Sequence, residues 1–226
     1  NLVIAAPADG PELRAALDAQ GVRYRPFYIS NKIFVHAGDQ ALAMTLAARA
    51  DVAKITPNNQ YQLQEPIIER DPPLQILAIE SNITFIQAQD VWALGFTGQG
   101  TVLAGNDTGL DWDHPAIINH YRGWDGFSAD HNYNWWDATG TYPTIPGDGH
   151  GHGTHTTGTM VGDDGGANQI GVAPGAQTIH CKNMTDGGSG DDYPFSECFA
   201  WDLAPWDLSG ADPRPDLAPQ AVNNSW

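Results

Sequence analysis

The sequence predicts two units in succession, a small α+β unit and a larger α/β unit built on a parallel sheet. Residues 1–64 alternate short apolar runs with helical stripes in the order β-α-β-β-α-β, a split βαβ unit of the ferredoxin-like kind. Residues 80–226 alternate buried strands with helices, which is typical of a parallel sheet covered by helices. Residues 65–79 are charged and rich in proline, and we interpret them as an exposed linker.

The first unit starts with an apolar run at residues 2–5, which we interpret as a strand. Asp9 and Glu12 have the spacing of a capping box, so we expect a helix that Asp9 caps and that ends at Gly21. The remaining elements are two strands, a helix opened by Asp39 and an extended segment, at residues 22–29, 32–36, 39–47 and from Ile55 onward.

The second unit contains three predicted helices and three predicted strands. The strands are short runs of small and apolar residues, and one helix is rich in glycine and threonine, which suits close packing on a sheet. We expect helices at residues 85–94, 152–161 and 193–203, and strands at residues 101–106, 176–184 and 220–226.

The composition limits the classes of function. The chain has 27 acidic and 10 basic residues and a formal charge of -17, which argues against binding nucleic acid through a basic patch. The sequence has no long apolar window, so we expect no membrane-spanning helix. The segment after Asn1 lacks the basic and apolar regions of a signal peptide, and we expect any such peptide to have been removed. Cys181 and Cys198 are compatible with one disulfide or with two buried thiols.

An acidic residue directly follows the strand predicted at residues 101–106. Asp107 therefore falls at the carboxyl edge of a parallel sheet, where such folds place their sites, and Gly109 permits a sharp turn there. The alternative is a carboxylate that only caps a helix or a turn.

Three histidines, His150, His152 and His155, lie around the start of the glycine-rich helix. If Asp107 accepts the hydrogen on Nδ1 of His152, the ring tautomer is fixed and Nε2 is free to act as a general base. The alternative is a zinc site made by the three histidines, which would make the protein a metal-dependent hydrolase.

A glycine-rich segment, Gly188, Ser189 and Gly190, follows the strand predicted at residues 176–184. Because it carries no bulky side chains, it leaves an open edge to which an extended peptide could add as a strand. The alternative is a flexible surface turn.

These segments together resemble the subtilisin family of serine proteases over residues 80–226. Asp107-Thr-Gly with the following His114-Pro resembles the family's catalytic Asp segment, and His152-Gly-Thr-His resembles its catalytic His segment. Further similar segments, in the family's order, are Gly171-Val-Ala-Pro-Gly-Ala, Gly188-Ser-Gly190 and Asn223-Asn-Ser225-Trp226. The surroundings of both cysteines and the closing Asn-Asn-Ser-Trp look most like a bacillopeptidase F-like branch.

The resemblance implies a serine endopeptidase with an Asp-His-Ser triad, of which this chain supplies Asp107 and His152. It implies that substrate contacts come from Asp148 on the S2 side and from the segments that line S4 and S1, namely Gly188, Ser189, Gly190, Ser225 and Trp226. Residues 1–64 would be an inhibitory and chaperoning pro-segment that contacts the catalytic domain, cut near Gln64. The alternative is a permanent accessory domain.

The sequence departs from the family pattern, because its 226 residues contain no Gly-Thr-Ser nucleophile motif and no segment for the oxyanion-hole Asn. We therefore expect a catalytic domain that is incomplete in this chain, with a second polypeptide carrying the rest. The alternative is a non-catalytic protein of the same fold that binds peptides or inhibits.

We expect a secreted, extracellular protein that acts on protein or peptide substrates, with no nucleic acid partner. The chemistry requires no cofactor. A structural calcium ion is compatible with the loop after the glycine-rich helix, where Asp163, Asp164 and Asn168 are candidate oxygen ligands.

Overall fold

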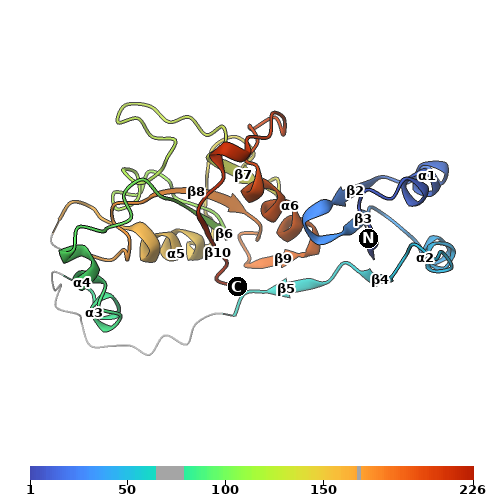
Figure 1. Ribbon diagram of the computed structural model, residues 1–226, viewed down its shortest axis with the longest axis horizontal. Coiled ribbons are helices and arrows are strands. Elements are labelled where there is room, and N and C mark those ends of the chain that lie inside the picture. Colours follow the sequence, from blue (N-terminus) through green and yellow to red (C-terminus); the bar gives the residue numbers. More distant parts are fainter. Residues whose placement is uncertain (65–78, 167–168) are drawn as a thin grey trace.

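The computed structural model describes residues 1–64, 79–166 and 169–226, and it shows a small N-terminal unit beside a larger α/β unit (Figure 1). The predicted linker lies outside the described residues except for Ile79. Among the described helices, none is long and apolar enough to cross a membrane.

The N-terminal unit is a four-stranded antiparallel sheet with two helices, in the strand order β2-β3-β1-β4. Its elements are β1 (Leu2–Ala5), α1 (Pro11–Ala19), β2 (Tyr24–Phe27), a 3₁₀ turn (Tyr28–Ser30), β3 (Lys32–Val35), α2 (Gln40–Ala47) and β4 (Lys54–Pro57). This is the order of strands and helices that the sequence predicts. Buried apolar side chains from the sheet and both helices form its core: Ile4, Leu13, Leu17, Ile33, Val35, Leu42 and Leu46.

The two helices of this unit begin differently. The predicted capping box of α1 is wrong, because Gly10 and not Asp9 precedes the helix and no side chain caps its amides. Pro11 takes the first helical position, where its fixed φ fits and no amide hydrogen needs a partner. α2 begins as predicted, since Asp39 Oδ1 accepts a hydrogen bond from the Leu42 amide at 2.8 Å.

The larger unit is built on a parallel four-stranded sheet in the order β10-β6-β8-β7. Its elements are α3 (Ser81–Phe85), α4 (Ala88–Ala93), β6 (Val102–Asp107), β7 (Trp135–Asp137), α5 (His152–Val161), β8 (Gln177–Lys182), β9 (Ser189–Asp191), α6 (Asp192–Leu203), a 3₁₀ turn (Pro215–Leu217) and β10 (Ala221–Asn223). The predicted parallel α/β sheet is therefore confirmed.

Alternation along β6 and β8 sends successive side chains to opposite faces of this sheet. One face packs against α6 through a buried cluster that consists of Ala104, Ile179, Cys181, Cys198, Trp201 and Trp206. On the other face, Gly105 and His180 lie next to Thr157 of α5. The two helices thus cover opposite faces and leave the carboxyl edge of the sheet between them (Figure 1).

Three local predictions differ from the structure. The helix predicted at residues 85–94 is wrong in its extent, because Gln87, at a φ of 59°, separates α3 from α4. The extended segment predicted from Ile55 onward is divided into two strands, β4 and β5 (Gln60–Gln62). The strand β7 is absent from the sequence prediction. Both β5 and β7 are three residues long and depend on a partner distant in sequence, β9 for the first and β8 for the second, so local pattern gives little sign of their bounds.

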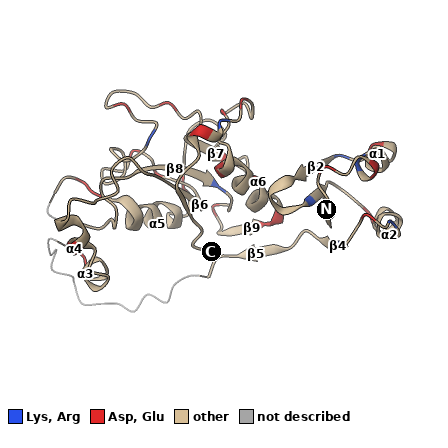
Figure 2. Cartoon of the chain, in the orientation of Figure 1, with Lys and Arg blue, Asp and Glu red and all other residues tan. Residues whose placement is uncertain are grey.

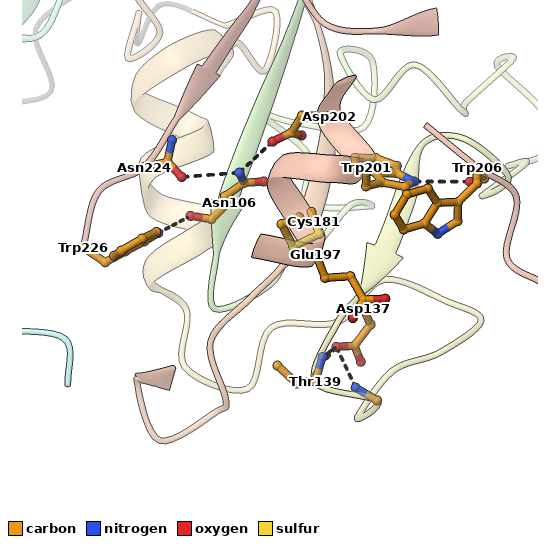
Figure 3. The surroundings of a disulfide bond; sticks show 12 residues. Asn106, Asp137, Thr139, Cys181, Glu197, Trp201, Asp202, Trp206, Asn224 and Trp226 are labelled. Atoms are coloured by element: carbon orange, nitrogen blue, oxygen red, sulfur yellow. Dashed lines mark hydrogen bonds between the residues drawn. A yellow bond between two sulfur atoms is a disulfide. The ribbon is translucent and has the colours of Figure 1, made fainter. Parts of the chain in front are cut away.

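A disulfide joins Cys181 of β8 to Cys198 of α6 (Figure 3), which decides between the two alternatives left by the sequence. Both cysteines are fully buried under the α6 face of the sheet. The bond closes a loop with a sequence separation of 17 residues, which carries the whole β9 edge.

Replacing both cysteines by alanine is expected to lower the free energy of unfolding by about 3 kcal/mol, because a cross-link of this loop length restricts the unfolded chain. Urea unfolding measures the loss. Strong reductant should lower the stability of the wild-type protein and leave that of the double variant unchanged. A double variant as stable as the oxidised wild type would contradict the prediction.

Candidate active site

Asp107 is the last residue of β6 and has no solvent exposure. Its Oδ1 accepts a hydrogen bond from the Thr108 amide at 2.7 Å, and its Oδ2 accepts one from Thr156 Oγ1 at 3.3 Å. Its main-chain carbonyl accepts hydrogen bonds from the amides of Asn183 and Met184. Both the backbone and the carboxylate are therefore fixed at the edge of the sheet.

His152 is the first residue of α5, and its Nδ1 lies 2.7 Å from Asp107 Oδ1. Because an ionised carboxylate only accepts hydrogen bonds, this contact assigns the ring hydrogen to Nδ1 and leaves Nε2 as the basic nitrogen. The His152 side chain is 16% exposed, while the Asp107 side chain is fully buried. A buried carboxylate thus orients a ring that other groups can reach.

Close contact between two glycines allows α5 to approach the sheet. A Cβ on Gly153 would lie 2.2 Å from the carbonyl oxygen of Gly109 and 3.1 Å from Asp107 Cβ. Gly109 itself has a φ of 138°, and a Cβ there would lie 2.0 Å from Gly147 O. The absence of a side chain at Gly153 therefore lets α5 lie against the turn after Asp107, and the absence of one at Gly109 lets the Gly147–Asp148 segment lie against the same turn.

Asp148 holds the loop that leads into α5. Its Oδ1 accepts hydrogen bonds from Thr108 Oγ1 at 2.8 Å and the Gly151 amide at 2.9 Å, and its Oδ2 accepts two from Thr154. Burial raises the pKa of this carboxyl, but the hydrogen bonds from Thr154, Gly151 and Thr108 outweigh burial and hold the pKa below its usual value. The predicted S2 contact of Asp148 stays a prediction beside this positioning role.

A buried cation lies beneath the same turn, and the sequence analysis missed it. Lys182 is the last residue of β8 and has no exposure, and its Nζ donates to the Thr108 carbonyl and, at 2.8 Å, to Asp186 Oδ1. Basic residues are sparse in the larger unit (Figure 2). Asp186 also accepts a hydrogen bond from Tyr142 Oη at 2.8 Å. Burial raises the pKa of Asp186, but the Lys182 and Tyr142 contacts outweigh it and lower that pKa. The pair ties β8 to the Asp107–Thr108 turn.

A fully buried histidine lies on the α5 face of the sheet. His180 occupies the space left by Gly105, where a Cβ would come within 2.6 Å of its Nδ1, and it stacks on Trp135 with ring centroids 6.0 Å apart. Neither ring nitrogen has a hydrogen-bond partner among the described residues. Burial therefore lowers the pKa of His180 to about 4, although the negative charge of Asp107 acts in the opposite direction.

The side chain of Asn106 joins β6 to α6 and to the segment after β10 (Figure 3). Asn106 Nδ2 donates to Asp202 Oδ2 at 2.7 Å and to Asn224 Oδ1 at 3.3 Å. Burial raises the pKa of Asp202 to about 7, although the Asn106 hydrogen bond opposes the shift. The residue next to Asp107 is thus held from both neighbouring elements.

The predicted peptide-binding edge is already paired with another part of the same chain. β9, which contains Ser189 and Gly190, pairs antiparallel with β5, and Tyr61 lies opposite Gly190 (Figure 1). The Leu63 amide donates to the Gly188 carbonyl at 2.8 Å, which continues the pairing by one residue. This edge is therefore able to accept an extended strand, as the sequence analysis proposes.

Aromatic and apolar side chains surround this edge. Leu63 is 6% exposed and packs with Met184, Phe195 and Phe199. The Trp226 ring stacks on Phe195 with centroids 3.8 Å apart, and its Nε1 donates to the Asn106 carbonyl at 2.9 Å. The structure thus brings Trp226 to the same apolar surface as the β9 edge.

Ser225 makes hydrogen bonds only with Asn223 among the described residues, through its Oγ. Its predicted substrate contact stays a prediction. Phe195 lies at this edge although the sequence does not indicate it. Its helical spacing to Phe199 does not indicate which of the two rings faces the edge.

The described residues contain no group of three or more His, Cys, Asp or Glu arranged to hold a metal ion. The three histidines of the zinc alternative therefore do not converge, and the rings of His150 and His152 stand edge to face with centroids 6.2 Å apart. In the loop after α5, Asp163 and Asp164 accept hydrogen bonds from the amides of Gly165 and Gly166. Asn168 lies outside the described residues, so the calcium site stays a prediction.

Comparison with known proteins identifies the family of this site. The sequence profile of the subtilase family of peptidases matches residues 98–226, which include Asp107, His152 and the β9 edge. The chain therefore belongs to the subtilase family.

Curated relatives include bacillopeptidase F of Bacillus subtilis (strain 168), 40% identical over 210 residues that cover 88% of this chain and 14% of that protein. The minor extracellular protease Vpr of the same organism is 30% identical, covering 64% of this chain and 18% of Vpr. Its major intracellular serine protease is also 30% identical, covering 71% of this chain and 50% of that protein. The chain spans at most half the length of these relatives.

Among solved structures, fervidolysin from Fervidobacterium pennivorans, a keratinolytic enzyme related to subtilisin, is similar to this chain. The TM-score is 0.62 at 16% sequence identity, covering 100% of this chain and 35% of that structure. This similarity shows a subtilisin-like fold.

Replacing Gly153 by alanine is expected to lower the free energy of unfolding by about 2 kcal/mol, because the new Cβ would overlap Gly109 and force α5 from the sheet. Urea unfolding measures the loss, and the His152 ring signals in an NMR spectrum should shift. Gly158→Ala is the matched control in the same helix, because its Cβ would meet only Ile170 Cδ1, at 3.8 Å. Equal effects of the two substitutions would contradict this account of the helix approach.

The contribution of His180 to stability is expected to fall as the pH falls from about 6.5 to about 4, because the unfolded chain binds a proton at His180 in this range while the folded chain does not. The raised pKa of Asp202 acts in the opposite direction over the same range, so a comparison with a His180 variant isolates the effect. The full effect of His180 is about 3 kcal/mol. Urea unfolding across this range measures it. The stability of the wild type relative to His180→Gln should fall by about this amount between pH 6.5 and pH 4, and the exposed His155→Gln should show no such pH-dependent difference from the wild type. An unchanged slope in His180→Gln would contradict the prediction.

Proposed function

We propose that this chain is the N-terminal portion of a subtilisin-type serine endopeptidase, carried together with its pro-segment. The observation that supports this proposal is the 2.7 Å contact between the fully buried Asp107 carboxylate and Nδ1 of His152 at the carboxyl edge of a parallel sheet. Family membership supplies the class of chemistry, that of a serine protease.

In the proposed reaction, Nε2 of His152 takes the proton of a serine hydroxyl, and the serine oxygen attacks the carbonyl carbon of the peptide bond. Asp107 keeps the ring in the required tautomer and stabilises the imidazolium that forms. His152 then returns the proton to the leaving amine. The serine and the oxyanion-hole Asn would come from polypeptide beyond these 226 residues.

The N-terminal unit is proposed to be a ferredoxin-like inhibitory pro-segment, comprising residues 1–64. Its β-α-β-β-α-β order and antiparallel sheet support the fold, and the pairing of β5 with β9 supports the inhibitory role. A substrate that adds to β9 as a strand would compete with β5 for the same hydrogen bonds. Gln64 follows the buried Leu63 at the end of this pairing, and the self-cleavage point is proposed to lie there.

The substrates are proposed to be proteins or peptides bound in extended form along β9. The apolar surface made by Phe195 and Trp226 favours apolar side chains at the S4 side. Secretion is proposed on two grounds, the disulfide between Cys181 and Cys198, which persists in oxidising compartments, and the relative named an extracellular protease.

The second candidate function is peptide binding without catalysis. The pairing of β5 with β9, which supports the inhibitory role, would also be enough for a protein that only binds peptides. The two candidates differ in whether a reactive serine joins Asp107 and His152.

In the longer polypeptide that carries the serine, His152→Ala is expected to lower the peptide hydrolysis rate by about four orders of magnitude and to stop cleavage near Gln64. Labelling with a fluorophosphonate and intact mass measure the two effects. His155→Ala, in the same helix, should keep labelling and cleavage, whereas a zinc hydrolase would take up no label and would lose cleavage on this substitution.

Two outcomes would contradict the proposal. If the His152→Ala variant is still cleaved cleanly near Gln64 with no other protease in the sample, His152 is not needed for that cleavage and the proposed self-processing is wrong. A full-length protein that binds peptides but takes up no fluorophosphonate would favour the non-catalytic candidate.

A further inference from the structure

A second contact joins the N-terminal unit to the larger unit, away from the β5–β9 pairing. Strand β2 lies beside α6 (Figure 1), and Arg25 of β2 reaches Glu197 of α6. The Arg25 Nη1 atom donates to Glu197 Oε1 at 2.6 Å and to Tyr193 Oη at 3.2 Å. Two side chains of α6 therefore share one nitrogen of the guanidinium.

Aromatic rings complete the surroundings of this guanidinium. The Arg25 Cζ lies 5.9 Å from the Tyr193 ring centroid and 5.7 Å from that of Trp206, both in the larger unit. It also lies 5.5 Å from the ring of Phe27, within β2 itself. A delocalised cation gains from such ring faces, and arginine uses them more often than lysine does.

The acidic partner belongs to the larger unit and is almost completely buried. The side chain of Glu197 is 5% exposed, whereas that of Arg25 is 38% exposed. Burial raises the pKa of Glu197, and the Arg25 charge opposes this shift. A buried carboxylate without its cation is strongly unfavourable, so α6 needs a cation at this place whenever the N-terminal unit covers it.

An apolar contact between Tyr193 and the sheet of the N-terminal unit positions Arg25 relative to α6. The Tyr193 ring packs edge to face on Phe34, with centroids 4.7 Å apart, and on Phe27 at 5.5 Å. Val3 of β1 belongs to the same cluster. The sheet of the N-terminal unit thus lies on Tyr193 and carries Arg25 into the place between Tyr193, Glu197 and Trp206.

We propose that Glu197, Tyr193 and Trp206 form an arginine-binding site on the peptidase part, by which this protein recognises its own N-terminal unit through Arg25. The ligand class is a planar guanidinium, and the occupant is Arg25. The site acts as a second anchor, so the N-terminal unit stays docked even when a peptide takes the place of β5 on β9. The inference rests on the proposed role of the N-terminal unit as a detachable pro-segment.

The test vacates the site in the intact chain and refills it with a small cation. In Arg25→Ala, hydrogen exchange of the amides in α6 is expected to rise at least about tenfold, because the uncompensated Glu197 weakens the docking. Added ethylguanidinium should restore most of the protection, and ethylammonium at the same concentration should restore much less. Arg23→Ala, an exposed position of the segment leading into β2, is the matched control and should leave exchange unchanged.

Two further variants keep the test decisive if Arg25→Ala folds poorly. Arg25→Lys keeps the charge but not the planar fork, and should show an intermediate rise in exchange. Glu197→Gln alone should raise hydrogen exchange of the α6 amides. In the double variant with Arg25→Ala, ethylguanidinium should no longer restore protection of these amides. Unchanged α6 exchange in Arg25→Ala, or equal rescue by both cations, would overturn the inference.

Because these measurements need no serine and no cleavage, they fail or succeed independently of catalysis. A chain that shows the guanidinium response but is never cut near Gln64 would support the arginine-binding site and contradict the proposed protease. A protease that cuts near Gln64 but shows no guanidinium response would support the proposed function and contradict the arginine-binding site.

Discussion

The close approach of α5 to the carboxyl edge of the parallel sheet is the constraint on which the candidate site depends. It is possible because Gly153 presents no side chain to the backbone of Gly109. The contact places the first residue of the helix, His152, so that its ring nitrogen lies 2.7 Å from the last residue of β6, Asp107. The buried Lys182 then holds the turn after Asp107 through the Thr108 carbonyl.

The two units of the chain meet at β9 and at α6 of the larger unit. β5 supplies main-chain hydrogen bonds to β9, and these would suit almost any extended peptide. The contact around Arg25 is of another kind, because it needs a planar cation, a buried carboxylate and aromatic rings in one arrangement. Strand pairing provides general affinity, and the guanidinium contact provides recognition of one particular partner.

Several ionisable groups are kept away from water around the carboxyl edge of the sheet, and each has a physical consequence. Burial disfavours the charged form of His180 and lowers its pKa to about 4, and Lys182 Nζ lies 2.8 Å from Asp186 Oδ1. Asp202, with a pKa raised to about 7, lies against the residue before Asp107. The electrostatics of the site are therefore set as much by the sheet beneath it as by the two residues at its surface.

The sequence by itself determined the family, the parallel sheet and the proximity of Asp107 to His152, because these follow from short local segments. The short apolar strand that ends at Asp107 and the glycine-rich helix that begins at His152 are each recognisable from a few consecutive residues. Their order along the chain indicates that both residues lie at the carboxyl edge of the parallel sheet. The helix at residues 152–161 was predicted at its observed bounds, since its start and its small residues are local features.

Only the tertiary structure decided the contacts between residues far apart in sequence. The strand β5 pairs with β9, and the Lys182 amine is accommodated inside because Asp186 and the Thr108 carbonyl accept its hydrogen bonds there. Nothing in the sequence around Arg25 indicates that its partner is Glu197, which lies 172 positions further along the chain. Such pairs arise from the way two folded units fit together, and that fit depends on shape and burial, which local sequence pattern does not contain.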